Sequence, residues 1–114
     1  MKLSDQQFMF AQDLVRLCYW LITHDYKYTL GEAWRPDEMQ EIYFEKGLSK
    51  VKERGAHGNR LAQDLNIWVE GKLSYKKEDL QPVGDYWESL DEKNTWGGNW
   101  KSFVDTPHFE RRKE

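Results

Sequence analysis

The sequence holds a single cysteine, Cys18, among 114 residues, so no intramolecular disulfide bond can form. Its apolar stretches are much shorter than the roughly 20 residues that a membrane-spanning helix needs, so we expect no membrane insertion. Lysine and arginine (17) are outnumbered by aspartate and glutamate (20), for a net charge of −3. Because nucleic-acid-binding domains carry basic surfaces, this charge balance argues against nucleic acid as a partner.

Aromatic residues are plentiful, with six Trp, six Tyr and five Phe. Together with 39% hydrophobic residues they are enough for a packed core, although 32% of the residues are charged. A chain of this length fits one domain, so we expect a single domain over residues 1–114, and a monomer. The start, MKLSDQQF, has no apolar core of a signal peptide, so we expect the chain in the cytoplasm where it is made.

Apolar residues at helical spacing predict an amphipathic helix over about residues 4–23. On its core side we expect Phe8, Ala11, Val15, Cys18 and Ile22, joined by Leu14, Leu17 and Leu21. A second helix is predicted to open at Pro36, because proline suits the first helical position and acidic residues follow it. Gly47 is the expected end of that helix.

The rest of the chain predicts short strands and one short helix. A strand is expected near residues 28–34 and a loop over 48–60. Residues 61–69 alternate as a strand, with the core face formed by Leu61, Gln63, Leu65, Ile67 and Val69. We expect a turn at EGK and a helix after Pro82. Beyond that helix we expect a glycine-rich loop at TWGGNW and a final short strand at PHFER.

The stretch GAHGNRLAQD, residues 55–64, contains two unusual features. His57 stands between Gly55 and Gly58, and Asp64 lies within a predicted strand, where aspartate is rare. Seven positions of continuous strand span about 23 Å, and seven of helix about 10 Å. Both distances are too long for two ligands of one metal ion. Since Gly58 and Asn59 favour turns, we predict a loop that doubles back and places His57 over Asp64.

The stretch DTPHFE, residues 105–110, offers a third ligand, His108, with Asp105 three positions before it. Pro107 prevents a regular helix there, so a turn can aim both side chains into one pocket. Two histidines and one carboxylate form an established catalytic zinc set. In this interpretation His57, Asp64 and His108 hold the metal, and Asp105 is the general base.

A purely structural interpretation fits the same spacing. Asp105 can cap a turn, and His108 can be a hydrogen-bonded, partly buried histidine. His24, beside Asp25 at a helix end, is an example of such a histidine, for which we expect only a favourable contact with the helix dipole. Residue spacing alone leaves both interpretations open.

Four blocks of the sequence resemble the zinc D,D-carboxypeptidases and L-alanyl-D-glutamate endopeptidases, and among these the small phage endolysins. The blocks are GEAWR, AHGNRLAQDLNIW, GDYWESL and WGGNWKSFVDTPHFE. Their order and spacing agree with the family from about Leu30 to Glu110. The resemblance implies a small α+β fold, shared with D-Ala-D-Ala dipeptidases and the hedgehog signalling domain. In that fold an antiparallel sheet carries a zinc site and helices pack on its back.

The resemblance also implies Zn²⁺ as cofactor, with His57, Asp64 and His108 as its ligands. Asp105 falls at the position of the family's catalytic carboxylate. Arg35 falls at that of an arginine that holds the substrate carbonyl or carboxylate and stabilises negative charge. The implied substrate is the peptide stem of bacterial peptidoglycan, cut between L-Ala and D-Glu. A D,D-carboxypeptidase on the same pocket is one alternative, and a non-catalytic zinc-stabilised module that binds the wall or a protein is another.

Some positions depart from the family pattern. Gly55 stands where relatives usually have a serine that contacts substrate, which affects substrate detail but no metal ligand. Arg60 and Thr106 stand where glycine is common. The segment with Trp96, Gly97, Gly98 and Trp100 either lines the substrate groove or packs under a loop. A phage lysin of this kind waits in the host cytoplasm and acts on the periplasmic wall after release.

Overall fold

The protein is described here by a computed structural model that covers residues 1–49 and 55–114. Of the loop predicted over residues 48–60, positions 50–54 lie outside the described residues. No helix in the described part of the chain is long and apolar enough to cross a membrane.

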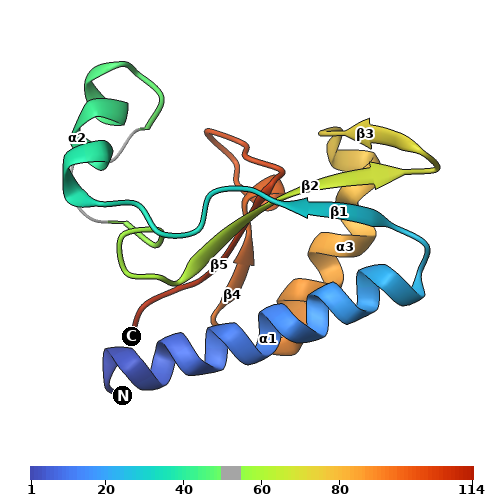
Figure 1. The fold of residues 1–114 in the computed structure, drawn as a ribbon, viewed down its shortest axis with the longest axis horizontal. Coiled ribbons are helices and arrows are strands. Elements are labelled where there is room, and N and C mark those ends of the chain that lie inside the picture. Colours follow the sequence, from blue (N-terminus) through green and yellow to red (C-terminus); the bar gives the residue numbers. More distant parts are fainter. Residues whose placement is uncertain (50–54) are drawn as a thin grey trace.

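In the described residues, three α-helices and a five-stranded antiparallel sheet make up an α+β fold, as predicted (Figure 1). The strand order is β1-β2-β5-β4, and β3 pairs with β2. In chain order the elements are α1 (Leu3–Thr23), β1 (Lys27–Leu30), α2 (Asp37–Glu45), β2 (Ala62–Val69), β3 (Lys72–Ser74), α3 (Lys77–Leu90), β4 (Asn94–Trp96), the 3-10 turn η1 (Gly97–Asn99) and β5 (His108–Arg111).

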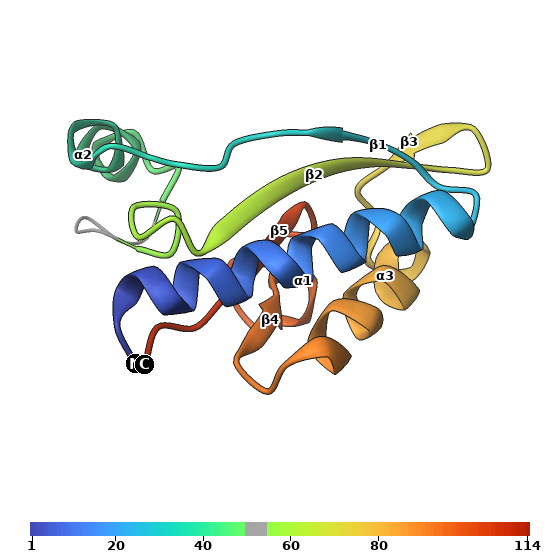
Figure 2. The same cartoon turned by 60° about the horizontal axis from the view of Figure 1, so that its bottom comes forward.

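The core lies between the sheet and two helices. α1 and α3 pack against each other on one side of the sheet, and α2 lies apart at one end of the molecule (Figure 2). The alternation predicted for residues 61–69 is confirmed, because the odd-numbered positions turn toward the helices. The buried hydrophobic cluster comprises Phe10, Leu17, Leu21, Leu61, Leu65, Ile67, Leu80, Val83, Trp87, Trp96 and Phe109.

The helix predicted over residues 4–23 is confirmed as α1, but its core face was predicted correctly only in part. Leu17 and Leu21 are buried and Leu14 packs against the core, whereas other residues predicted for that face point outward. Phe8, Val15 and Ile22 are 62%, 69% and 61% exposed. Asp13 lies on the buried face, where its carboxylate accepts a hydrogen bond from Asn94 Nδ2 at 3.1 Å. The helix is apolar on two faces, and packing against α3 and the sheet selects the other one. The buried residues are Gln6, Phe10, Asp13, Leu17 and Leu21.

The helix expected after Pro82 instead begins at Lys77, so that Pro82 lies inside α3. Proline lacks the N–H that an interior helical position uses, which normally weakens a helix. Here the turns on either side are held by burial, since Leu80, Val83 and Trp87 are all at most 1% exposed. Tertiary packing therefore extends the helix through a proline that, by itself, favours a helix start.

The segments around α2 follow the sequence more closely. α2 starts at Asp37, directly after Pro36, and the chain reverses beyond its end at Gly47, whose φ is +74°. β1 is shorter than predicted and ends at Leu30. The residues that follow it run without regular structure from the sheet to α2, and they include Arg35.

Candidate metal centre

The register between β2 and β5 brings two predicted ligands face to face. Asp64 and His108 are direct partners across this antiparallel pair. Opposed residues of an antiparallel pair project to the same side of the sheet. Their neighbours, the pair Gln63 and Phe109, are buried on the opposite side with the core. Asp64 and His108 therefore share the face that the helices leave open.

The loop before β2 turns back and delivers His57 to the same place. Its turn is closed by backbone bonds from Asn59 N to the Gly55 carbonyl and from Arg60 N to the His57 carbonyl, each 3.1 Å long. Arg60 has a φ of +59°, which permits the sharp reversal into the strand. As the sequence predicted, the reversal places His57 beside Asp64, with Nε2 3.3 Å from Oδ1.

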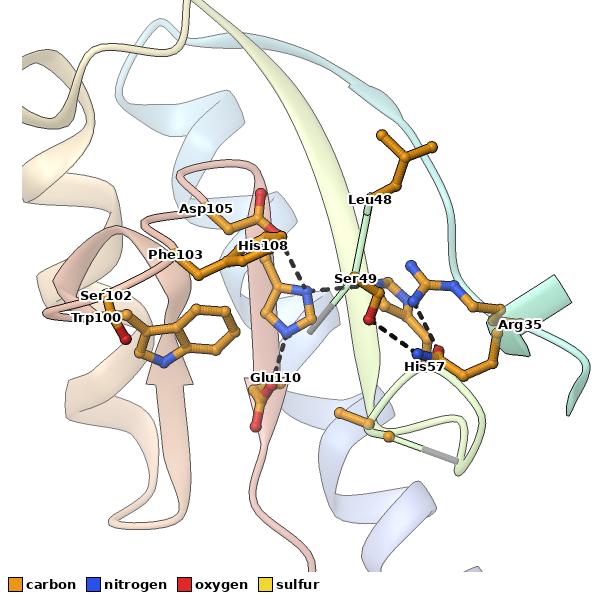
Figure 3. A pocket seen from close by; sticks show the side chains of 13 residues that line it. Arg35, Leu48, Ser49, His57, Trp100, Ser102, Phe103, Asp105, His108 and Glu110 are labelled. Carbon is orange, nitrogen blue, oxygen red and sulfur yellow. Dashed lines mark hydrogen bonds and ion pairs between the residues drawn. The ribbon is translucent and has the colours of Figure 1, made fainter. Parts of the chain in front are cut away.

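Three ligand-type atoms converge: His57 Nε2, Asp64 Oδ1 and His108 Nδ1. The Asp64 oxygen lies 3.3 Å from each ring nitrogen, and the two nitrogens lie 3.2 Å apart. All three atoms are within 4.8 Å of one another. Figure 3 shows the two histidine rings turned toward each other across the site.

The outer nitrogens of both histidines are held by acceptors. His57 Nδ1 lies 2.6 Å from the Ala33 carbonyl oxygen, and His108 Nε2 lies 2.6 Å from Glu110 Oε1. A nitrogen that donates to such an acceptor leaves a lone pair on the other ring nitrogen, which here is the one that faces the site. Both rings are thereby oriented as metal ligands.

The residues present fit a zinc ion. Within residues 1–49 and 55–114, Asp64 Oδ1 is buried and has no hydrogen-bond donor in acceptable geometry. A buried carboxylate oxygen without a donor is costly, and a cation would satisfy it. The donor set of two imidazole nitrogens and one carboxylate is also one that catalytic zinc takes.

Asp64 and His108 shift each other's pKa. Burial disfavours the ionised form of Asp64, but His108 and His57 outweigh burial and lower the pKa of Asp64 to about 2. Burial also disfavours the charged form of His108, but the carboxylates of Asp64 and Glu110 beside it raise the pKa of His108 to about 9. In the metal-free protein a proton on His108 therefore occupies part of the place that a metal ion would take.

Asp105 stands beside this cluster but outside it. Its Oδ2 lies 4.0 Å from His108 Nδ1, and its side chain is 36% exposed. Its backbone N–H donates to the Gly97 carbonyl at 3.0 Å, and its own carbonyl accepts the His108 N–H at 3.2 Å. Burial raises the pKa of Asp105, and the charge on Asp64 adds to that rise. A carboxylate with a raised pKa next to a metal site is suited to proton transfer.

Arg35 lines the same cavity from the segment between β1 and α2. Its Nε donates to Glu32 Oε1 at 2.9 Å, its Nη2 also pairs with Glu32, and its Nη1 donates to Gln40 Oε1 at 2.8 Å. Its guanidinium lies over the Tyr43 ring, 4.7 Å from the centroid. A further link joins it to the metal-site loop, because the Arg35 N–H donates to the His57 carbonyl at 3.3 Å. Arg35 is thus held in one orientation.

A family model described as D-alanyl-D-alanine carboxypeptidase matches residues 2–111. The chain belongs to this peptidase family. The resemblance identified from the sequence is therefore confirmed. A search of the curated proteins finds no match.

Among solved structures, the L-Ala D-Glu endopeptidase ChiX of Serratia marcescens is similar to this chain, with a TM-score of 0.68. The match covers 88% of this chain and 78% of that one, at 23% sequence identity. At this identity the likeness concerns the fold, and it confirms the α+β class expected from the sequence.

The cavity of this peptidase has a volume of about 280 Å³, and it opens between two groups of side chains (Figure 3). Trp100, Phe103 and Asp105 lie on one side, and Arg35 and His57 lie on the other. The Trp100 ring is 5.0 Å from the His108 ring. One wall is therefore aromatic, and the metal-site face is polar.

The buried residues of the TWGGNW segment pack behind the cavity and do not line it. This segment forms β4 and η1, and Trp96 is fully buried, with Nε1 donating to the Thr106 carbonyl at 2.8 Å. A Cβ on Gly97 would lie 2.2 Å from the Asp105 carbonyl oxygen. Gly97 thus lets the turn that carries Asp105 pack directly on the 3-10 turn, and only Trp100 of the four singled-out residues lines the cavity.

Sequence reasoning missed two carboxylates of the peptidase site. Glu110 lies two residues after His108 in β5, so the period of a strand alone places it on the same face. Glu32 lies three residues before Arg35 and pairs with it. Glu110 could have been found from the alternation of the strand. No local pattern indicated that the Glu32 side chain pairs with Arg35.

Proposed function

We propose that the protein is a zinc-dependent peptidase of the peptidoglycan stem that hydrolyses the L-alanyl-D-glutamate bond. The observation that carries this proposal is the convergence of His57 Nε2, Asp64 Oδ1 and His108 Nδ1 beside a fourth carboxylate, Asp105. A structural metal site needs no such additional carboxylate, whereas a hydrolase needs a general base.

The three converging residues would hold the metal. Zn²⁺ bound there supplies a Lewis acid and lowers the pKa of a water molecule toward ~7. The protein's own contribution is the proton path. Asp105 accepts a proton from the attacking water and later donates it to the amine nitrogen that leaves when the peptide C–N bond breaks. Burial raises the pKa of Asp105, which favours the protonated form that makes the second transfer.

Arg35 stabilises the negative charge that develops on the carbonyl oxygen of the substrate. Its fork is fixed by Glu32, Gln40 and Tyr43, so little reorganisation is needed when charge develops. A planar guanidinium in a fixed pose offers a second N–H toward the cavity while another remains bonded to its anchor.

A D,D-carboxypeptidase is the second candidate, favoured by the description of the family model. Such an enzyme must bind the free carboxylate at the end of its substrate. The pairing of Arg35 with Glu32 works against this, because Arg35 then carries its counter-ion already. This pairing supports the endopeptidase as the first candidate.

The cellular setting that we propose is that of a phage-type endolysin. In this setting the protein accumulates in the cytoplasm and reaches the periplasmic cell wall only after a separate agent opens the inner membrane. Turbidity loss of permeabilised Gram-negative cells, compared with intact cells and with chelator-treated protein, tests this setting.

Mass spectrometry of purified stem peptides after digestion tests the function itself. We expect a product that begins with D-Glu, its loss with a chelator, and its return with Zn²⁺. Release of only a terminal D-Ala would make the protein a carboxypeptidase. If protein with one equivalent of zinc binds wall fragments but cleaves none of the stem peptides, the protein is a non-catalytic binding module. Asp105→Asn protein, digested in parallel, controls for contaminating hydrolases.

A further inference from the structure

α1 has a second apolar face that nothing in the described structure covers. Its inner face packs on the core, and yet four large side chains on the outer side are 61% to 69% exposed. A helix that is apolar on both faces is normally buried on both. The four side chains are Phe8, Val15, Tyr19 and Ile22.

The outer face has a regular pattern of large and small residues. Phe8, Val15 and Ile22 follow one another at intervals of seven residues. Between them, also at intervals of seven, stand three small residues, Ser4, Ala11 and Cys18. Ser4 and Ala11 are exposed, and Cys18 is half-buried at the edge of this face, beside Tyr28 of β1. Apolar positions that alternate by three and four residues form the seam of a two-helix contact.

We propose that this face binds a second copy of the chain, with the two α1 helices packed antiparallel around a twofold axis. α1 runs from Leu3 to Thr23, so its midpoint is residue 13. An antiparallel pair centred there aligns residues whose numbers add up to 26. The three large residues spaced by seven then each meet a small one: Phe8 with Cys18, Val15 with Ala11, and Ile22 with Ser4. Tyr19, at the edge of the face, meets Gln7.

This self-complementarity favours a second copy over other occupants. Large residues opposite small ones interdigitate, which two helices with large residues in register cannot do. The full length of both helices, about 31 Å, is in contact in this register. At the edge of the seam, Asp5 of one copy lies near Tyr19 of the other, where a phenol can donate to a carboxylate.

Charge argues against a lipid surface as the occupant. Helices that lie on anionic membranes carry lysine and arginine along their polar face. The residues that border the outer face of α1 are Asp5, Gln12 and Arg16, and the net charge of the chain is −3. A neutral border of this kind suits contact with a second protein.

The dimer leaves the active site accessible. No residue that lines the cavity, within the part of the chain that the structure describes, comes from α1. A single helix pair gives an interface at the small end of the range for specific contacts, so we expect association in the micromolar range. This proposal replaces the monomer expected from the sequence with a dimer, because the outer face of α1 is exposed.

Sedimentation analysis of the zinc-loaded full chain tests the interface. We expect the mass to rise from 13.7 kDa toward twice that value between about 1 and 500 μM. Val15→Glu should stay monomeric with unchanged helix content and activity. Leu73→Glu, at an exposed apolar residue of β3, should dimerise as the parent does.

A parent chain that stays monomeric throughout this range overturns the proposal, and so does a dimer that Val15→Glu leaves intact. Flotation with phosphatidylglycerol vesicles tests whether the outer face of α1 binds lipid instead of a second copy. A protein that floats with the vesicles and stays monomeric in solution would also refute the proposed dimer.

Oxidative cross-linking through the native Cys18 tests the direction of the helices. In the proposed register the two Cys18 residues are offset by about 15 Å along the axis, so the parent forms no disulfide dimer. Phe8→Cys should form one, mapped by mass spectrometry to position 8 of one copy and Cys18 of the other. Ile22→Cys, equally exposed on the same face, meets Ser4 and should not cross-link. Efficient cross-linking of both the parent and Ile22→Cys indicates parallel helices and contradicts the proposed arrangement.

Discussion

Glu110→Gln should change the affinity for zinc by an amount that depends on pH. The amide oxygen of glutamine can still accept the His108 Nε2–H, so the orientation of the ring is kept while the negative charge is lost. Outer-shell partners of this kind are worth about 10- to 100-fold in metal affinity. That loss is the intrinsic effect, and it applies when His108 is unprotonated.

Proton competition hides part of this loss at neutral pH. The pKa of His108 is about 9, so at pH 7 only about 1% of the metal-free protein has His108 ready to bind, which costs the parent about 100-fold in affinity. Removing the Glu110 charge lowers the pKa of His108, by about one unit for one charge-assisted hydrogen bond. The variant then regains about tenfold at pH 7, so its net loss there is about 1- to 10-fold.

Above the pKa of His108 in the parent this compensation disappears. We therefore expect the ratio of zinc affinities, parent over Glu110→Gln, to grow about tenfold between pH 7 and about pH 9.5. Titration against a chelator of known affinity at each pH measures this ratio. Glu78→Gln, at an exposed residue of α3, is the matched control and should give a ratio of one throughout. A ratio for Glu110→Gln that stays constant or falls with pH would refute the coupling of Glu110 to the metal through His108.

Three further variants test the other parts of the site. Asp105→Asn should fold and bind zinc as the parent does but lose hydrolysis by about 10²-fold or more, with partial activity in Asp105→Glu; loss of zinc would instead make Asp105 a ligand. Arg35→Lys should lower turnover by about 10²-fold at unchanged zinc content, because an ammonium cannot reproduce the fork held by Glu32; normal turnover would remove Arg35 from the mechanism. Gly97→Ala should destabilise the protein by about 1–3 kcal/mol in denaturant unfolding and lower turnover, since its Cβ would meet the Asp105 carbonyl. Gly55→Ala is the control: this residue has open space around it, so the substitution should leave stability unchanged.

Elements with strong local signals were predictable from the sequence. Pro36 and Gly47 bracket α2 because each restricts or relaxes the backbone at its own position, whatever the rest of the chain does. The alternation over residues 61–69 and the return of the chain around His57 are also local. The proposed ligands were found because their residue types are rare in such settings, and the meeting of His57 with Asp64 needed only a turn.

Tertiary packing decided the features that depend on distant parts of the chain. Pro82 lies within a helix because the burial of neighbouring side chains outweighs the lost hydrogen bond. The pairing of Asp64 with His108 depends on the register of two strands that lie far apart in sequence, and no local pattern specifies that register.

α1 marks the division most clearly. The sequence by itself determined that residues near 4–23 form a helix, because helical spacing of apolar residues is a local property. It did not determine which face turns inward, since the row with Phe8 and Val15 and the row with Phe10 and Leu17 are both apolar at helical spacing. That choice belongs to packing, because only the surface offered by α3 and the sheet distinguishes the two rows.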